Sequence, residues 1–329
     1  MNRIVLTDRT NPFANLALEE LLFESSFPDM TFFLWQNSRT VVIGRSQNAY
    51  RECRVEELEG AGGHLARRAS GGGAVYHHLG NLNFTFCCPE PLFDLERQFS
   101  VLLRAVRTLG VEAALSGRND LTAEGRKFSG NAFRHARGRA MHHGTLLVNE
   151  NMDDLSRYLN VDPAKMASKG VQSVRARVVN LASLDPDIDI PKLKEALMTA
   201  FRAEYGEADL LTEADFAGPE LAAKTEKYAS WAWRMGENPA FDLRLERRFP
   251  FGSLEVLLQV SGSVIRSASV FSDMLDPDFP AALAGRLSGC PFSSEAVRRA
   301  AEDLTPPEIA RETADFLAEA LASPPTAGT

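Results

Sequence analysis

The segment ARRASGGGAVYHHLGNLNFTF, residues 66–86, combines two arginines, three consecutive glycines and an alternating apolar run. Glycine has no Cβ, so backbone N–H groups in such a loop can approach a ligand closely, although ordering them costs conformational entropy. Arginine is a planar, permanently charged partner for carboxylate and phosphate groups. The segment therefore predicts an anion-binding loop, followed by a strand over NLNFTFCC, residues 81–88.

The glycine run matches neither common phosphate-binding motif. Residues 70–76, SGGGAVY, lack the Gly-Lys-Ser/Thr of a P-loop and have no Gly-x-Gly-x-x-Gly spacing. A tight turn between two strands is the structural alternative. The two preceding arginines favour ligand binding over that alternative.

Composition is typical of a soluble globular protein. The 329 residues are 44% hydrophobic and 24% charged, with a formal net charge of −8. This acidic balance argues against a generic nucleic-acid-binding protein. No apolar run approaches the ~20 residues that a membrane span needs. Because the N-terminus shows no signal or transit pattern, we expect a cytoplasmic protein.

The order of the predicted elements indicates an α+β fold. Helical spacing begins at about Ala14 and returns over residues 93–110, and two apolar runs at 31–35 and 40–44 read as buried strands. Four short strands with polar turns follow, between residues 111 and 148. Without a regular βαβ period, this order predicts a mixed, largely antiparallel sheet flanked by helices.

A small second domain is expected at the C-terminal end. Residues 151–170 read as a polar helix and residues 190–205 as another helix. After Gly236-Glu237-Asn238-Pro239 the pattern changes to strands, and helices follow from about Asp278. We therefore expect a domain over residues 1–243 and a small α/β domain over residues 244–329, with a possible hinge at 236–239.

Lys127 stands out because lysine is rare in the first half of this chain. The chain has seven lysines, and Lys127 is the only one in the first 164 residues, where all other lysine or arginine positions are arginine. A lysine ammonium is a compact, rotatable charge that can follow a moving oxygen, unlike the rigid guanidinium fork. Chance is the alternative, because a rare residue must fall somewhere. The sequence favours a functional role.

The remaining candidates for chemistry are weaker. Histidines 77–78 and 142–143 are adjacent pairs in predicted strands, where neighbours point to opposite faces, so neither pair would clamp one metal. Asp120 is the best acidic candidate, either for a magnesium ion or for holding Lys127, and a solvated turn is its ordinary interpretation. The four cysteines have no Cys-x-x-Cys spacing, so we expect buried reduced thiols.

Together these segments resemble the lipoate–protein ligase family along most of the chain. The segments that carry the resemblance are NPFANLALEE (11–20), FFLWQNSRTVVIGRSQN (32–48), the glycine segment (66–86), GRNDL (117–121), RKFSGNAFR (126–134), HHGTLL (142–147) and KGVQSVRARVVNL (169–181). The small C-terminal unit resembles the accessory domain of the two-domain bacterial enzymes. The resemblance implies a fold shared with biotin ligases and class II synthetases.

The resemblance also implies a reaction in two steps. Lipoate and ATP give lipoyl-AMP and pyrophosphate, and an acceptor lysine then takes the lipoyl group. It implies catalysis by Lys127 and Mg²⁺ at Asp120. The nucleotide- and lipoate-binding residues that it implies are Arg68, Ser70, Gly71, Gly72, Gly73, Ala74, Val75, Tyr76, Asn81, Asp120, Lys127, Ser129, Gly130 and His143.

The implied partners are lipoyl-domain acceptors, namely the E2 subunits of 2-oxoacid dehydrogenases and the glycine-cleavage carrier protein. The resemblance also implies a monomer that binds neither nucleic acid nor a membrane. One departure is His78, which stands where the family commonly has aspartate after the Tyr-His pair. We therefore expect neither His77 nor His78 to be catalytic.

Two other functions fit the same segments. An ATP-independent transferase could move octanoyl or lipoyl groups between carrier proteins, and related octanoyltransferases use a cysteine. Residues 115–127 contain no cysteine, which counts against a thioester route. A non-catalytic lipoyl-binding protein is the third possibility. The presence of Lys127 and of the arginine–glycine loop argues against it.

Overall fold

A computed structural model describes residues 1–117, 119–160, 178–236 and 242–322. The chain divides into two compact units. The first unit comprises Met1–Ile43, Ala49–Ala69 and Ala74–Arg234, and the second comprises Gly44–Asn48, Ser70–Gly73 and Met235–Thr329. The second unit thus takes in two short loops from the N-terminal half of the sequence. None of the described helices has the length and apolar character of a membrane span.

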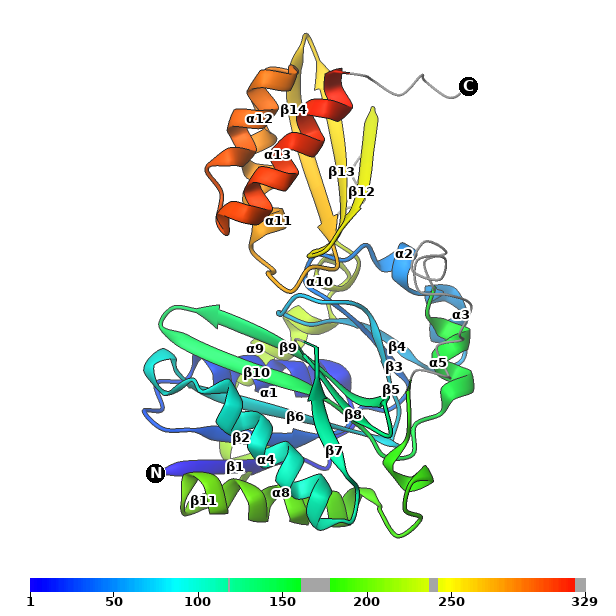
Figure 1. The fold of residues 1–329 in the computed structure, drawn as a ribbon, viewed down its shortest axis with the longest axis vertical. Coiled ribbons are helices and arrows are strands. Elements are labelled where there is room, and N and C mark those ends of the chain that lie inside the picture. The colour runs from blue at the N-terminus through cyan, green and yellow to red at the C-terminus, as the bar shows by residue number, and fades with distance from the viewer. Residues whose placement is uncertain (118, 161–177, 237–241, 323–329) are drawn as a thin grey trace. The chain divides into compact units, whose positions relative to one another are not determined.

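The first unit is built on an eight-stranded sheet (Figure 1). In spatial order its strands are β11 (Ala208–Thr212), β1 (Asn2–Leu6), β2 (Thr31–Trp35), β6 (Asn81–Pro89), β10 (Arg139–Leu147), β9 (Arg126–Ala136), β8 (Asp120–Ala123) and β7 (Ala113–Ser116). Strand β1 runs parallel to β11 and β2, and every other pair is antiparallel. The predicted mixed, largely antiparallel sheet is confirmed.

A second, three-stranded sheet in this unit carries the residues that flank the glycine run. Strand β3 (Thr40–Ile43) pairs in parallel with β4 (His64–Arg67) and antiparallel with β5 (Val75–His77). Both apolar runs at 31–35 and 40–44 are strands as expected. They belong to different sheets, however, so they do not pair with each other.

The described helices of the first unit are α1 (Pro12–Glu24), α2 (Ala49–Glu52), α3 (Val55–Gly60), α4 (Leu95–Thr108), α5 (Met152–Tyr158), α8 (Ile190–Tyr205), α9 (Pro219–Ala229) and α10 (Trp231–Met235). Of these, α1, α4, α5 and α8 lie where the sequence predicted helices, and α2, α9 and α10 were not predicted. Helix α1 begins at Pro12 rather than near Ala14, because the Asn11 side chain accepts the N–H groups of Phe13 and Ala14. The predicted helix over 151–170 ends at Tyr158, and its residues from 161 onward lie outside the described part.

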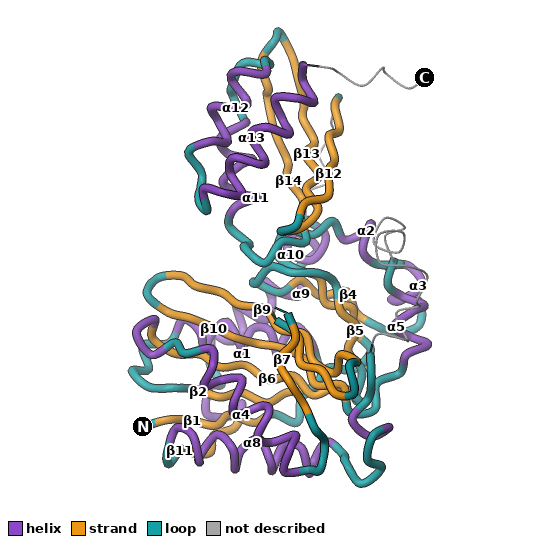
Figure 2. The backbone as a smooth tube through the Cα atoms, viewed as in Figure 1, coloured by secondary structure: helices purple, strands orange, loops and turns teal. Residues whose placement is uncertain are grey.

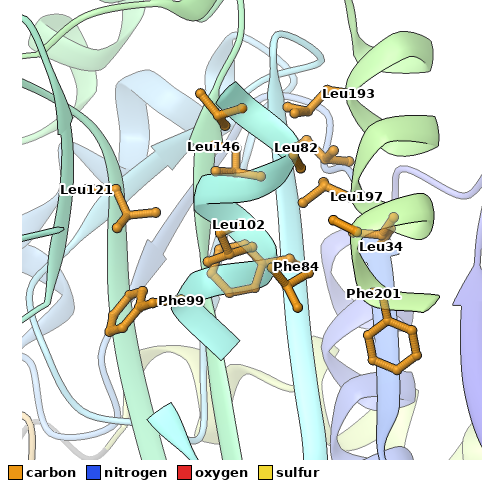
Figure 3. Close-up of a cluster of buried hydrophobic side chains, with 14 of the residues drawn as sticks. Leu34, Leu82, Phe84, Phe99, Leu102, Leu121, Leu146, Leu193, Leu197 and Phe201 are labelled. Atoms are coloured by element: carbon orange, nitrogen blue, oxygen red, sulfur yellow. The ribbon is translucent and has the colours of Figure 1, made fainter. Parts of the chain in front are cut away.

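Strand β6 separates two different faces of the large sheet. Leu82, Phe84, Phe86 and Cys88 point into an aromatic core that α4 and α8 cover, as Figure 3 shows for the labelled residues. The Phe201 ring of α8 stacks on Phe32 at 5.1 Å. Asn81, Asn83, Thr85 and Cys87 alternate with the first set and point to the other face, the face against which α1 packs.

The second unit contains its own sheet and core. Strands β12 (Leu243–Phe249), β13 (Gly252–Ser261) and β14 (Val264–Ser272) form an antiparallel meander (Figure 2). Helices α11 (Phe279–Leu287), α12 (Ser294–Glu302) and α13 (Pro307–Ala322) supply apolar side chains that pack on it. Strands followed by helices were expected here. The suggested hinge at 236–239 falls mostly on residues outside the described part.

Two strands were not predicted from the sequence. β1 (NRIVL) and β11 (ADLLT) are five residues each, and β11 is largely exposed at the edge of the sheet. Neither shows the alternation of polar and apolar residues that marks a half-buried strand. Their pairing is a long-range contact between the two ends of the first unit, which local patterns do not encode.

The aromatic core predicts a large cost for truncation at Leu102, which is fully buried on α4. Leu102→Ala should lower the free energy of unfolding by about 2–5 kcal/mol, because it leaves a cavity in a packed core. Leu92→Ala, at a position 47% exposed, is the control and should change it by less than about 0.5 kcal/mol. Urea unfolding measures both. Equal effects of the two substitutions would contradict this description of the core.

Candidate functional site

Lys127 forms an ion pair with Asp120. The Lys127 Nζ lies 2.8 Å from Asp120 Oδ1, and the two side chains are 39% and 37% exposed. Of the two roles considered for Asp120, the structure shows the one in which it holds Lys127. Partly exposed ion pairs contribute little to stability because water screens them. The carboxylate therefore orients the ammonium without preventing it from moving to another oxygen.

Strand register shows which residues of β9 and β10 lie on the same face of the sheet as the polar residues of β6. Residues directly opposite each other in antiparallel strands share a face. His143 pairs with Thr85 on one side and with Ala132 on the other, and Thr145 pairs with Asn83. The Gly130 N–H donates to Thr145 Oγ1 at 3.3 Å. Asn83, Thr85, His143, Thr145 and Gly130 thus lie on one face of the sheet.

A buried chain of hydrogen bonds runs across this face from β2 to β10. Trp35 Nε1 donates to Thr85 Oγ1 at 3.1 Å, and that hydroxyl donates to Glu19 Oε1 at 2.7 Å. The same carboxylate oxygen lies 2.8 Å from Nδ1 of His143. An ionised carboxylate only accepts hydrogen bonds, so Nδ1 of His143 carries a proton. Glu19, on α1, thereby fixes the orientation of the His143 ring.

Arg68 and His77 add a charge and a neutral ring to the buried polar residues. The Arg68 guanidinium donates to the Val42 carbonyl at 3.2 Å. Burial lowers the pKa of Arg68 to about 10, while the Glu19 carboxylate opposes that shift, so Arg68 stays charged at neutral pH. Burial, followed by the charges of Arg68 and His143, lowers the pKa of His77 to about 3. His77 is therefore a neutral hydrogen-bonding group.

Three buried polar atoms beside these residues lack a hydrogen-bond partner among the described residues. They are Nε2 of His77, Nδ2 of Asn83 and Oδ1 of Asn81. His77 Nδ1 and Asn37 Nδ2 lie 3.2 Å apart, and Asn81 Nδ2 donates to Asn83 Oδ1 at 2.9 Å. A buried polar atom without a partner costs about 1–3 kcal/mol. The cost is understandable where a ligand or water supplies the missing partner.

His142 and Ser129 are built into the structure on the side away from these groups. His142 Nδ1 lies 3.0 Å from Gln98 Oε1, and its Nε2 lies 2.8 Å from Asn131 Oδ1. Asn131 Nδ2 donates to Ser129 Oγ at 3.2 Å. The predicted opposite orientation of His142 and His143 is confirmed. In the structure Ser129 is a partner of Asn131, and its role toward a ligand stays a prediction.

The glycine run is divided between the units: Ser70–Gly73 belong to the second unit and Ala74 onward to the first. Gly72 has a positive φ of 91°, and its N–H donates to the Met274 carbonyl at 2.7 Å. A Cβ at Gly71 would collide with the carbonyl oxygens of Met274 and Leu275. Gly71 and Gly72 are thus required by the protein's own backbone, and their contact with a ligand stays a prediction.

Residues after the glycine run are held by α5. Tyr76 is buried, and its hydroxyl donates to Asp154 Oδ2 at 3.1 Å, while Ala74 and Val75 are half-buried. Glu150 is 3% exposed and accepts the N–H groups of His78 and Asn151, each at 2.8 Å. These contacts anchor the turn that leads from β5 into β6.

The cysteines are free thiols, three of them buried, as expected. Burial raises the pKa of Cys88 to about 11 and the pKa of Cys87 well above its usual value. A thiolate is the reactive form of cysteine, so these two residues are poor nucleophiles at neutral pH.

Sequence reasoning missed part of the site. Glu19, Trp35, Asn83 and Thr85 were not assigned a role, and His77 was set aside. One usable signal was present: Asn81, Asn83 and Thr85 are polar residues that alternate within a strand whose other face is aromatic. Position 118 of the GRNDL segment and positions 169–177 of the later segment lie outside the described residues.

The Glu150 carboxyl predicts a pH-dependent stability. Burial raises its pKa from 4.5 to about 7, against the opposing hydrogen bonds from His78 and Asn151. A raised folded-state pKa means stability that is complete below pH 4.5 and lost as pH rises through about 7. In Glu150→Gln this loss, on the order of 3 kcal/mol, should disappear. The variant should therefore gain stability relative to the wild type between pH 5 and pH 8.

Urea unfolding at several pH values measures this difference. Glu56→Gln replaces an exposed glutamate of α3 and serves as the control. Its free energy of unfolding should depend on pH in the same way as that of the wild type. A difference between Glu150→Gln and the wild type that does not vary with pH would contradict the assigned environment of Glu150.

Family models match both parts of the chain. Residues 11–202 match the model described as the lipoyl protein ligase A/B catalytic domain. Residues 238–321 match the model described as the bacterial lipoate protein ligase C-terminus. The first match alone spans more than half of the chain. Both agree with the resemblance inferred from the sequence.

Individual relatives agree as well. The chain is 42% identical to a lipoate-protein ligase A of Psychrobacter cryohalolentis, over 95% of this chain and 96% of that protein. It is similar to the crystal structure of P. falciparum LipL1 in complex with lipoate, with a TM-score of 0.87, 27% identity and coverage of 97% and 100% of the two chains. It is also similar to a lipoate-protein ligase A bound with ATP, with a TM-score of 0.59, 26% identity and coverage of 71% and 98%. The chain therefore belongs to the lipoyl protein ligase A/B family and is an enzyme of the lipoate–protein ligase type.

Proposed function

We propose that this ligase joins lipoate to protein lysines through an adenylate. In the first step the lipoate carboxylate attacks the α-phosphorus of ATP, giving lipoyl-AMP and releasing pyrophosphate. In the second step a lysine amine of the acceptor attacks the lipoyl carbonyl, and AMP leaves. The observation that carries this proposal is the Lys127 ammonium, which is half-exposed and oriented by Asp120 at 2.8 Å. It lies on the sheet face that also carries His143, the residue paired with Glu19 of α1.

Lys127 is proposed to contact both the lipoate carboxylate and the α-phosphate. Both steps need positive charge where negative charge develops, first on the phosphoryl oxygens and then on the departing AMP. A lysine held by a weak, exposed ion pair can exchange its carboxylate partner for a substrate oxygen. Losing one such group typically costs about 10²–10³-fold in rate.

The lipoyl chain is proposed to lie along the face that β6 and β10 share. The polar atoms that lack partners among the described residues, on Asn83 and on His77 of β5, and the proton-bearing His143 would hydrogen-bond polar atoms of the ligand, and the aliphatic chain itself would be held by burial. Burial of an aliphatic chain contributes about 0.8 kcal/mol per methylene, so the four chain methylenes of lipoate add roughly 3 kcal/mol. The glycine run and Arg68 are proposed to contact the nucleotide end. The lipoate and ATP in the similar structures support this pair of substrates.

Magnesium is proposed to accompany the nucleotide. Mg²⁺ is usually held by one or two carboxylates together with substrate phosphates and water. Asp120 offers one partly exposed carboxylate beside Lys127, which fits that pattern. The described residues include no cluster of three metal-binding side chains, and the proposed site does not need one. The ion would neutralise phosphate charge when bound.

The acceptors that we propose are lipoyl domains, namely those of the E2 subunits of 2-oxoacid dehydrogenases and the glycine-cleavage carrier protein. The protein is proposed to act as a cytoplasmic monomer. We also propose residues 1–243 as the catalytic domain and residues 244–329 as the accessory domain. The family name, which specifies protein lipoylation, supports the acceptor class.

The direct test mixes the protein with lipoate, Mg-ATP and an apo lipoyl domain, and measures the mass of the acceptor. We expect one lipoyl group to be added, only when ATP is present. Lys127→Ala should slow the addition by about 10²–10³-fold, because a charge-stabilising group is lost. Lys192→Ala removes an exposed lysine of α8 and should leave the rate unchanged.

A different result would change the assigned reaction. Addition without ATP, from an acylated carrier protein, would identify an acyl transferase. Addition only from synthetic lipoyl-AMP would confine the activity to the second step. No modification under any of these conditions would contradict catalysis.

A further inference from the structure

An irregularity in β9 decides which way Lys127 points. Leu121 pairs with Ser129, but the next residue, Thr122, pairs with Lys127. Phe128 is therefore an extra residue on β9, and the pair contains a β-bulge. In a regular strand, residues three apart point to opposite faces. The bulge shifts the alternation by one, so Lys127 and Gly130 come to the same face.

The bulge is fixed by burial. Phe128 is fully buried and belongs to the aromatic core, and Ser129 is also fully buried. Ser129 accepts from Asn131 Nδ2 on the side of His142, so Phe128 and Ser129 both face the core, which two consecutive strand residues do only at a bulge. Phe128 therefore holds the irregularity in place from the core side.

The Lys127 side chain lies directly over Gly130. A Cβ built on Gly130 would be 2.8 Å from Lys127 Nζ and 2.9 Å from its Cε, and it would meet no other atom of the described residues outside its chain neighbours within 4 Å. Gly130 also pairs with Asp120 across the strands, so the carboxylate that holds the ammonium stands opposite the same glycine. The missing side chain of Gly130 leaves the space that the ammonium fills.

We propose that Gly130 is a positioning residue for Lys127. The Lys127 ammonium is held where it meets its substrates by three features: the bare Cα of Gly130, the bulge at Phe128 and the Asp120 carboxylate. We call these three features the seat of Lys127. This inference rests on the proposed function, in which Lys127 is catalytic. It assigns Gly130 a role through Lys127, separate from the ligand contact that the family resemblance implies.

The seat predicts a specific phenotype for Gly130→Ala. The backbone of Gly130 does not have a positive φ, so alanine fits the main chain without strain. The added methyl group displaces only the end of a flexible side chain, and the fold should survive. A misplacement of about 1 Å at a reacting group can cost about 10²-fold in rate. We expect the kcat of adenylate formation to fall by roughly 10- to 100-fold, with a smaller change in the KM for lipoate.

The decisive experiment is a double-mutant cycle on adenylate formation, measured as pyrophosphate release. If Gly130 acts through Lys127, Gly130→Ala should slow the wild type but add nothing to Lys127→Ala. Gly60→Ala is the matched control, because a Cβ at Gly60 meets no atom within 4 Å in the part of the chain that the structure describes. It should leave the rate unchanged. Urea unfolding of all variants shows whether the fold is intact.

A second readout does not depend on the ligase reaction. The rate at which an amine-reactive reagent modifies Lys127, measured by peptide mass, should change in Gly130→Ala and not in Gly60→Ala. Unchanged labelling together with unchanged activity would overturn the seat, and so would equal slowing in the presence and absence of Lys127. An unfolded Gly130→Ala would overturn it as well, because the seat requires only Lys127 to move. If the wild type itself shows no ligase activity, but Gly130→Ala still changes the labelling rate of Lys127, the seat is supported and the proposed function is rejected.

Discussion

The central strand β6 must satisfy two incompatible environments at once. It is buried along almost its whole length, and its side chains alternate between an aromatic core and a face made of amide, hydroxyl, carboxylate and imidazole groups. Successive side chains of a strand point to opposite faces, so each set stays on its own face. A shift of the strand register by one residue would place the polar set in the core. The hydrophobic side under α4 and α8 thus fixes the register that brings Thr85 to Glu19 and His143.

The polar face follows from that constraint, and its charges are balanced locally. Glu19 accepts from Thr85 and faces His143, while its charge supports Arg68. Burial and these neighbours keep His77 neutral. Charged groups in such a low-dielectric region are tolerated only when paired or hydrogen-bonded. Lys127 differs from them, because its ion pair is partly open to water. The Lys127 ammonium can therefore exchange its carboxylate partner for another oxygen at a lower cost than the buried groups can.

Much of this arrangement could be predicted from the sequence because its signals are local. The strands from β6 to β10 and helices α1, α4 and α8 follow from short patterns. The pairing of Asp120 with Lys127 was one of two roles that the sequence left open for Asp120. The parallel pairing of β1 with β11 could not, since it joins residues some two hundred positions apart. The bulge at Phe128 could not be predicted from the sequence, for a related reason. A bulge is set by competition between the core and the partner strand, and one strand's sequence contains only half of that information.

The loop Ser70–Gly73 is held by backbone atoms of a distant part of the chain. Gly72 donates to Met274, Ser272 donates to the Ser46 carbonyl, and Gly71 leaves no room for a side chain beside Leu275. Recognition by backbone does not depend on the side chains at 274 and 275, and the Met274 side chain instead packs in the core of the second unit. The same feature means that a chain cut before residue 243 would keep the glycine run and lose its anchor. The C-terminal segment is in this sense part of the loop's scaffold, and not an appendage that evolution could discard without replacing those carbonyl groups.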